Sequence, residues 1–100
     1  MDLHDLRENW DALGSDDPLW AILADPAKRG NRWTPEEFFA TGEAEVDSYL
    51  ALLPTLGLAV PKGRALDFGC GAGRLSQALA RDVERTVGVD IAPSMVALAT

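Results

Sequence analysis

The apolar residues at the start of the chain recur at helical spacing. Four of them follow one another at steps of three and four: Leu3, Leu6, Trp10 and Leu13. This spacing predicts an amphipathic helix, and Gly14 is expected to end it. Asp17 and Pro18 then begin a second short helix, which is expected to end before Asp25.

A longer helix is predicted from Pro35 to about Leu56. Thr34 is placed as its N-cap, Pro35 stands at the first helical position, and Glu37 would complete a capping box. The apolar face of this helix is expected to contain Phe39, Val46, Leu50 and Leu53.

The last forty residues follow a strand, helix, strand, helix order. Strands are predicted at residues 64–68 and 85–89, the second of which leads into the acid at Asp90. Residues 74–82 place Leu75, Ala78 and Leu79 on one helical face. Another helix begins at Pro93. We expect an α/β chain with a helical lead-in over residues 1–60 and a strand-containing part over residues 61–100, entered through a turn at residues 61–63.

A glycine-rich turn joins the first strand to the helix that follows it. Gly69, Gly71 and Gly73 stand at every second position, where the missing Cβ lets the backbone bend and lets a ligand lie against it. The G-x-G-x-x-G spacing of dinucleotide-binding turns is absent, because the sixth residue from Gly69 is Arg74. The pattern present is D-x-G-x-G-x-G, beginning at Asp67.

An acidic residue follows at the end of the second strand. Asp90 stands 19 residues after Gly71, close to the roughly 20 residues at which such folds place a ribose-binding carboxylate. The glycine turn and Asp90 together predict a nucleotide-cofactor site.

Residues 64–100 resemble the first two cofactor motifs of the class I S-adenosylmethionine-dependent methyltransferases. The resemblance implies the N-terminal part of a Rossmann-like, doubly wound fold that uses S-adenosyl-L-methionine. It implies that Asp67 lies beneath the methionine end of the cofactor and that Asp90 holds the ribose. It implies that the methionine end is wrapped by the turn residues Gly69, Cys70, Gly71 and Gly73. It also implies that the adenine is flanked by Ile91 and Met95. The segments around Trp20 and Trp33 resemble the helical lead-in of some bacterial members.

Structural roles compete with several of these assignments. Asp67 is also a common turn former, Asp90 is also suited to a turn or helix cap before Pro93, and Met95 is equally suited to core packing. Cys70 is interpreted as a small space-filling residue, since no histidine partner accompanies it as a base.

Aromatic residues of the lead-in allow two interpretations. Trp33, Phe38 and Phe39 are suited to cover the sulfonium or line an acceptor site, because an aromatic face attracts a cation. The alternative, which we favour, is that they belong to the core.

Composition indicates a packed globular chain. Hydrophobic residues make up 47% and charged residues 25%, and the single cysteine excludes an internal disulfide. We expect a cytoplasmic protein without a membrane span or secretory signal. The net charge of −7 lies within residues 1–62, which disfavours a nucleic-acid partner.

The expected function is methyl transfer from S-adenosylmethionine to a small-molecule acceptor, largely by orientation of the two reactants. No catalytic residue, metal ligand or oligomeric state is assigned. Two alternatives remain: a truncated non-catalytic module that binds a cofactor or a partner, and, less favoured, a nicotinamide-dependent oxidoreductase. Because the sequence stops at Thr100 inside a predicted crossover helix, we expect the first part of a longer protein, inactive by itself and with an open sheet.

Overall fold

The computed structural model describes residues 1–60 and 62–100, and the predicted turn at residues 61–63 therefore lies partly outside the described residues. Four helical segments come first: α1 (Leu3–Asp16), α2 (Pro18–Ile22), a short 3-10 helix (Pro26–Lys28) and α3 (Pro35–Thr55). Strands and helices then alternate: β1 (Arg64–Phe68), α4 (Arg74–Leu79), β2 (Arg85–Val89) and α5 (Pro93–Ala99).

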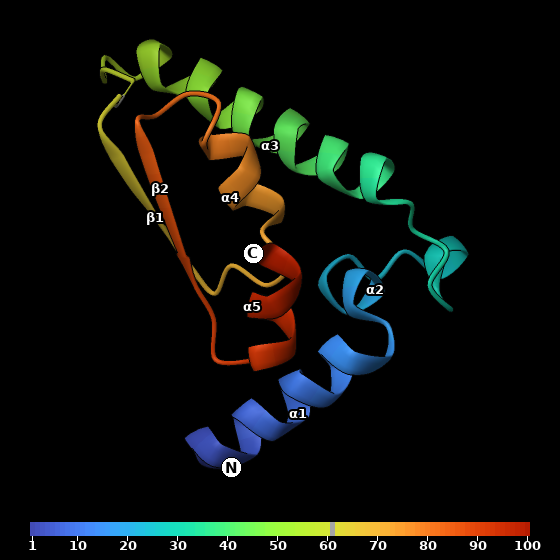
Figure 1. Ribbon diagram of the computed structural model, residues 1–100. Helices are drawn as coiled ribbons and strands as arrows, with labels where there is room; N and C mark the ends of the chain where they lie inside the picture. Colours follow the sequence, from blue (N-terminus) through green and yellow to red (C-terminus); the bar gives the residue numbers. More distant parts are fainter. Residues whose placement is uncertain (61) are drawn as a thin grey trace.

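The two strands form a parallel sheet in which Leu66 lies opposite Val87. Helix α4 connects them and contacts both, and α3 packs on α4, so these helices cover the same side of the sheet (Figure 1). The expected α/β organisation is confirmed as a partial Rossmann-like arrangement of a short parallel sheet with its crossover helix. On the other face the large side chains are exposed: Leu66, Phe68, Val87 and Val89.

Helix α1 does not end where the sequence predicts. It continues past Gly14 to Asp16, and Gly14 is buried within it. A Cβ on Gly14 would overlap the hydroxyl of Ser94 and lie 3.2 Å from Cγ of Met95. This glycine is therefore required by a close approach between α1 and α5 rather than by a helix terminus.

The predicted N-cap of α3 is confirmed, and the side chain of Glu37 has a further hydrogen-bond partner. The Thr34 hydroxyl accepts a 3.2 Å hydrogen bond from the Glu37 amide. The Glu37 carboxylate also accepts a 2.9 Å hydrogen bond from Lys28. Hydrogen bonding to Lys28 and, to a smaller extent, to Thr34 lowers the pKa of the Glu37 carboxyl. A reciprocal capping box forms at α1, between Asp2 and Asp5, which the sequence analysis did not anticipate.

The buried face of α3 is made by Phe38, Gly42 and Val46. Val46 was predicted, whereas Phe39 is only partly buried and its neighbour Phe38 is 0% exposed. A Cβ on Gly42 would overlap the backbone oxygen of Arg74, so this glycine lets the two helices touch.

Helix α4 is shorter than predicted, ending at Leu79, whereas β1 and β2 have the bounds of the predicted strands. Ion pairs fasten α4 and the turn after it to α3: Arg74 of α4 pairs with Glu45, and Arg81 of the turn pairs with Asp47 at 3.1 Å. Within the described residues no helix is long and apolar enough to cross a membrane.

Candidate functional site

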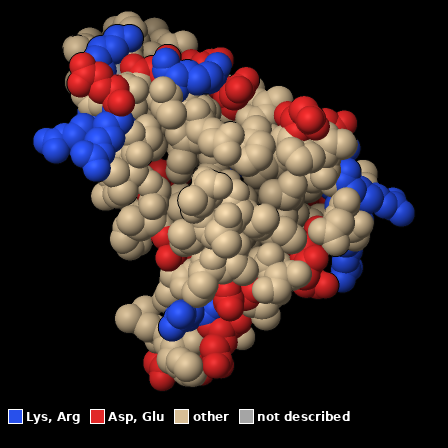
Figure 2. Space-filling view, in the orientation of Figure 1, with Lys and Arg blue, Asp and Glu red and all other residues tan. Residues whose placement is uncertain are grey.

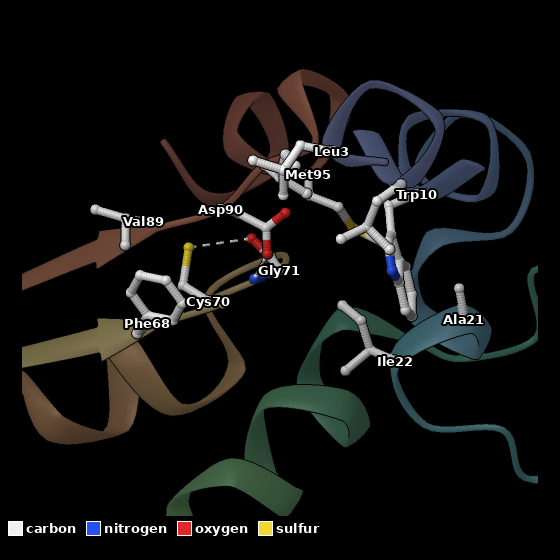
Figure 3. A pocket seen from close by; sticks show the side chains of 13 residues that line it. Leu3, Trp10, Ala21, Ile22, Phe68, Cys70, Gly71, Val89, Asp90 and Met95 are labelled. Carbon is white, nitrogen blue, oxygen red and sulfur yellow. Dashed lines mark hydrogen bonds between the residues drawn. The ribbon is translucent and has the colours of Figure 1, made fainter. Parts of the chain in front are cut away.

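A cleft of about 690 Å³ lies at the carboxyl ends of the two strands, bounded on its far side by α1 and α2 (Figure 3). Its volume falls in the range of small-molecule and cofactor sites. Most of the predicted site residues line it: Gly69, Cys70, Gly71, Asp90, Ile91 and Met95. Among the residues that the structure describes, Asp67 and Gly73 stand outside this lining.

The glycine turn has the backbone conformation that its spacing predicts. Gly69, Gly71 and Gly73 have φ angles of +77°, +54° and +86°, in the left-handed region that side chains disfavour. A Cβ on Gly71 would lie 2.9 Å from Cδ1 of Ile22. The amides of Gly69 and Cys70 both donate to the Val89 carbonyl, at 2.8 and 2.9 Å, and so fix the turn to the end of β2.

Asp90 connects the turn to the start of α5. One carboxylate oxygen accepts a 2.9 Å hydrogen bond from the Gly71 amide, and the other accepts one of the same length from the Ala92 amide. The turn role considered for Asp90 is therefore present. Each carboxylate oxygen has a second lone pair, so this role leaves acceptor capacity toward the cleft.

Asp67 lies below the turn, on the side of β1 that faces α4. Its carboxylate accepts a 2.7 Å hydrogen bond from the Ser76 hydroxyl, which fixes the first turn of α4 to the strand. Gly88 in β2 completes this arrangement, because a Cβ there would lie 2.9 Å from both Cβ of Cys70 and Oγ of Ser76. Gly88 was not among the predicted site residues, although a glycine inside an apolar strand indicates that another part of the chain approaches the strand closely.

Cys70 fills space in the turn. It is 8% exposed, and its thiol donates a 3.5 Å hydrogen bond to the Gly71 carbonyl. Burial, followed by the nearby carboxylates of Asp90 and Asp67, raises the pKa of the Cys70 thiol. The thiol therefore remains protonated at neutral pH, which disfavours a nucleophilic role.

The aromatic residues of the lead-in divide between two locations. Phe38 belongs to the core, with its ring edge-to-face against Trp33 and Phe39 at 6.0 and 5.3 Å. Trp33 and Phe39 line a separate hollow of about 390 Å³, which also contacts Ala72 of the glycine turn. The core interpretation is thus confirmed for Phe38.

The far wall of the main cleft comes from residues of the first two helices that were not among the predicted site residues. These residues are apolar: Leu3, Leu6 and Trp10 of α1, and Ala21 and Ile22 of α2. Their helical spacing was the available signal, but spacing does not tell which surface a helix covers. Charged side chains gather toward the margins of the face seen in Figure 2, and its middle is uncharged.

Comparisons with known proteins agree with this geometry. Residues 65–100 match a family model described as a methyltransferase domain. The glycine turn and Asp90, which carry the two predicted motifs, both lie within the matched residues. The resemblance to the S-adenosylmethionine-dependent enzymes is thereby confirmed, and the family implies use of that cofactor.

Curated relatives extend the match slightly. Ubiquinone biosynthesis O-methyltransferases from two strains of Xanthomonas campestris pv. campestris, B100 and 8004, are each 45% identical to the chain over 42 residues. The aligned segment is 42% of this chain and 18% of each relative. The chain therefore spans less than a fifth of the length of these relatives. No solved structure matches the chain significantly.

Proposed function

We propose that this chain supplies part of the cofactor site of an S-adenosylmethionine-dependent methyltransferase that acts on a small molecule. The observation that carries the proposal is the Gly71–Asp90 hydrogen bond at the cleft, which unites the two motifs into one site. In this proposal residues 1–60 form a helical lead-in over the cleft and residues 61–100 the first part of the cofactor-binding domain.

The chemistry of the cleft suits the cofactor. Nothing lies within 4 Å of the position of a Cβ on Gly69, so the turn leaves room for a ligand against its backbone. The Asp90 carboxylate offers acceptors to ribose hydroxyls. Ile91 adds apolar surface for a planar base. Met95 also lines the cleft but is only 1% exposed, so its side chain serves mainly as core packing beside the site. Asp67 supports the turn from below through Ser76.

When bound, S-adenosylmethionine would supply an activated methyl group. The residues described here bind and orient it and exclude water from it, which is the main contribution expected of a protein in a direct displacement. None of them is assigned as a general base. The names of the relatives, which concern ubiquinone biosynthesis, support a small-molecule acceptor.

Calorimetric titration of the complete protein with S-adenosylmethionine, S-adenosylhomocysteine and NAD⁺ tests the cofactor. We expect binding of the first two and none of NAD⁺, because the glycine spacing is not that of a dinucleotide site. Preferential binding of NAD⁺ would replace the proposal by the oxidoreductase alternative.

The acceptor class needs a second experiment. The protein is incubated with methyl-labelled S-adenosylmethionine and a cell extract, which is then separated into small molecules, protein and nucleic acid. Label is expected in the small-molecule fraction. Label confined to protein or nucleic acid would refute the acceptor class, and cofactor binding without any transfer would favour the non-catalytic module.

A further inference from the structure

The N-terminus of α5 receives its cap from a distant part of the chain. Its N-cap residue, Ala92, has no side-chain acceptor, and Pro93 at the first helical position has no N–H. The Ser94 amide donates a 2.7 Å hydrogen bond to Oδ1 of Asp11 in α1, 83 residues earlier. The Ser94 hydroxyl donates a second bond, of 2.9 Å, to the Asp11 backbone oxygen.

Gly14 makes this contact close. One helical turn after Asp11, its missing side chain gives room to Ser94 and Met95. The negative charge of Asp11 also stands at the end of α5 where helix amides favour an anion. The hydrogen bonds from Ser94 lower the pKa of the Asp11 carboxyl, and Arg7 contributes to the same direction. A capping hydrogen bond, a hydroxyl bond and a close approach thus join the two helices.

Both of the joined helices line the main cleft. Trp10, next to Asp11 in sequence, lines the cleft from α1, and Met95, next to Ser94, lines it from α5 (Figure 3). Leu6 lies on the same wall as Trp10. Displacement of α1 from α5 would therefore remove this wall and open the cleft to water.

We propose that Asp11 is a positioning residue of the cofactor site. It docks α1 on α5 through Ser94, and so holds Leu6 and Trp10 across the cleft from the proposed cofactor-binding turn. This inference rests on the proposed function, since it takes the ligand of the cleft to be S-adenosylmethionine.

The experiment compares the complete wild-type protein with Asp11→Ala, Asp11→Asn and Asp16→Ala. Asn retains an acceptor for the Ser94 amide, whereas Ala does not. Asp16 is an exposed acid at the end of the same helix and serves as the matched control. Two quantities are measured: hydrogen exchange of the α1 amides without ligand, and the Kd for S-adenosylmethionine by calorimetry.

Asp11→Ala should lose protection in α1 and raise the Kd about fivefold, the ratio equivalent to one typical helix cap. Asp11→Asn should keep most of the wild-type amide protection and affinity, and Asp16→Ala should behave as wild type. Unchanged exchange in Asp11→Ala would overturn the docking role. Lost protection with an unchanged Kd would overturn the positioning role.

Failure of the proposed function gives a different result. A wild-type protein that does not bind S-adenosylmethionine refutes that function, and with it the assignment of Asp11 to a cofactor site. A wild-type protein that binds while Asp11→Ala binds equally well refutes only the present inference.

Discussion

The amide of Gly71 donates a 2.9 Å hydrogen bond to the carboxylate of Asp90. The same carboxylate also receives the Ala92 amide, so one side chain sets both the turn after β1 and the approach to α5. Asp90, which we propose to hold the ribose, therefore also fixes the glycine turn that lines the cleft.

Replacing Asp90 by Ala should weaken cofactor binding by roughly 2–4 kcal/mol, through lost bonds to the ligand and a less ordered turn. The free energy of unfolding should also fall, by about 1–2 kcal/mol, because two backbone amides lose their acceptor. Both effects should be smaller in Asp90→Asn than in Asp90→Ala, since the side-chain amide of Asn retains one acceptor oxygen. Calorimetry and denaturant unfolding measure both quantities.

Glu84→Ala, a change at an exposed acid before β2, provides the control. A folded Asp90→Ala protein with the wild-type Kd would show that Asp90 acts only as a turn residue.

Gly71→Val should abolish cofactor binding. The substitution forces a branched residue into a φ of +54° and places its side chain against Ile22 at the edge of the cleft. Gly57→Val is the matched control, because Gly57 has a φ of +74° and nothing within 4 Å of a Cβ. The control should show the backbone strain in its thermal stability and keep its affinity. Equal losses of affinity in both variants would contradict a specific role for the turn.

The contact between Asp11 and Ser94 should weaken in acid. The folded pKa of Asp11 is lowered, so its contribution to stability is present above the unfolded value of about 4 and is lost as pH falls through the folded value. The amide chemical shift of Ser94, followed by NMR from neutral to acidic pH, should report this titration. In Asp11→Asn the Ser94 shift should stay flat over the same range; a transition that persists there would assign the titration to another carboxyl.

The open face of the sheet should make residues 1–100, expressed alone, associate in solution. Leu66 and Phe68 are 65% and 86% exposed, beside Val87 and Val89 on the neighbouring strand. An uncovered apolar sheet with free edges favours pairing between copies. Sedimentation should show oligomers for this polypeptide. The paired substitution Leu66→Lys and Val87→Glu, at directly opposite positions, should shift it toward monomer.

A monomeric wild-type polypeptide that unfolds cooperatively would contradict this prediction. The single substitution Ser48→Ala, on the exposed surface of α3, should leave the association unchanged.

The residues of the glycine turn themselves predicted much of its conformation. The positive φ angles at Gly69, Gly71 and Gly73 follow from the absence of side chains, and the Thr34 cap follows from residues within one helical turn of it. The cofactor roles of Asp67, Asp90, Ile91 and Met95 remain predictions, although the structure brings all but Asp67 to the cleft.

Features that depend on distant contacts were not predictable in the same way. Gly14 looked like a helix end because its reason, the approach of Ser94, lies far along the chain. Leu3 and Trp10 form an obvious apolar stripe, but nothing within α1 shows that this stripe covers the ends of the strands. Phe38 and Phe39 are adjacent, and the local sequence does not show which of them faces the core.

The hydrogen bond by which Asp11 caps α5 also determines when α1 can dock on α5 during synthesis. Asp11 leaves the ribosome 83 residues before Ser94, a delay on the order of ten seconds at ordinary translation rates. During that interval α1 can contact α2 but lacks α5, and closing so long a loop is entropically costly. The wall of the cleft is therefore expected to assemble last, after the α3–α4 contact and the parallel strand pair have formed.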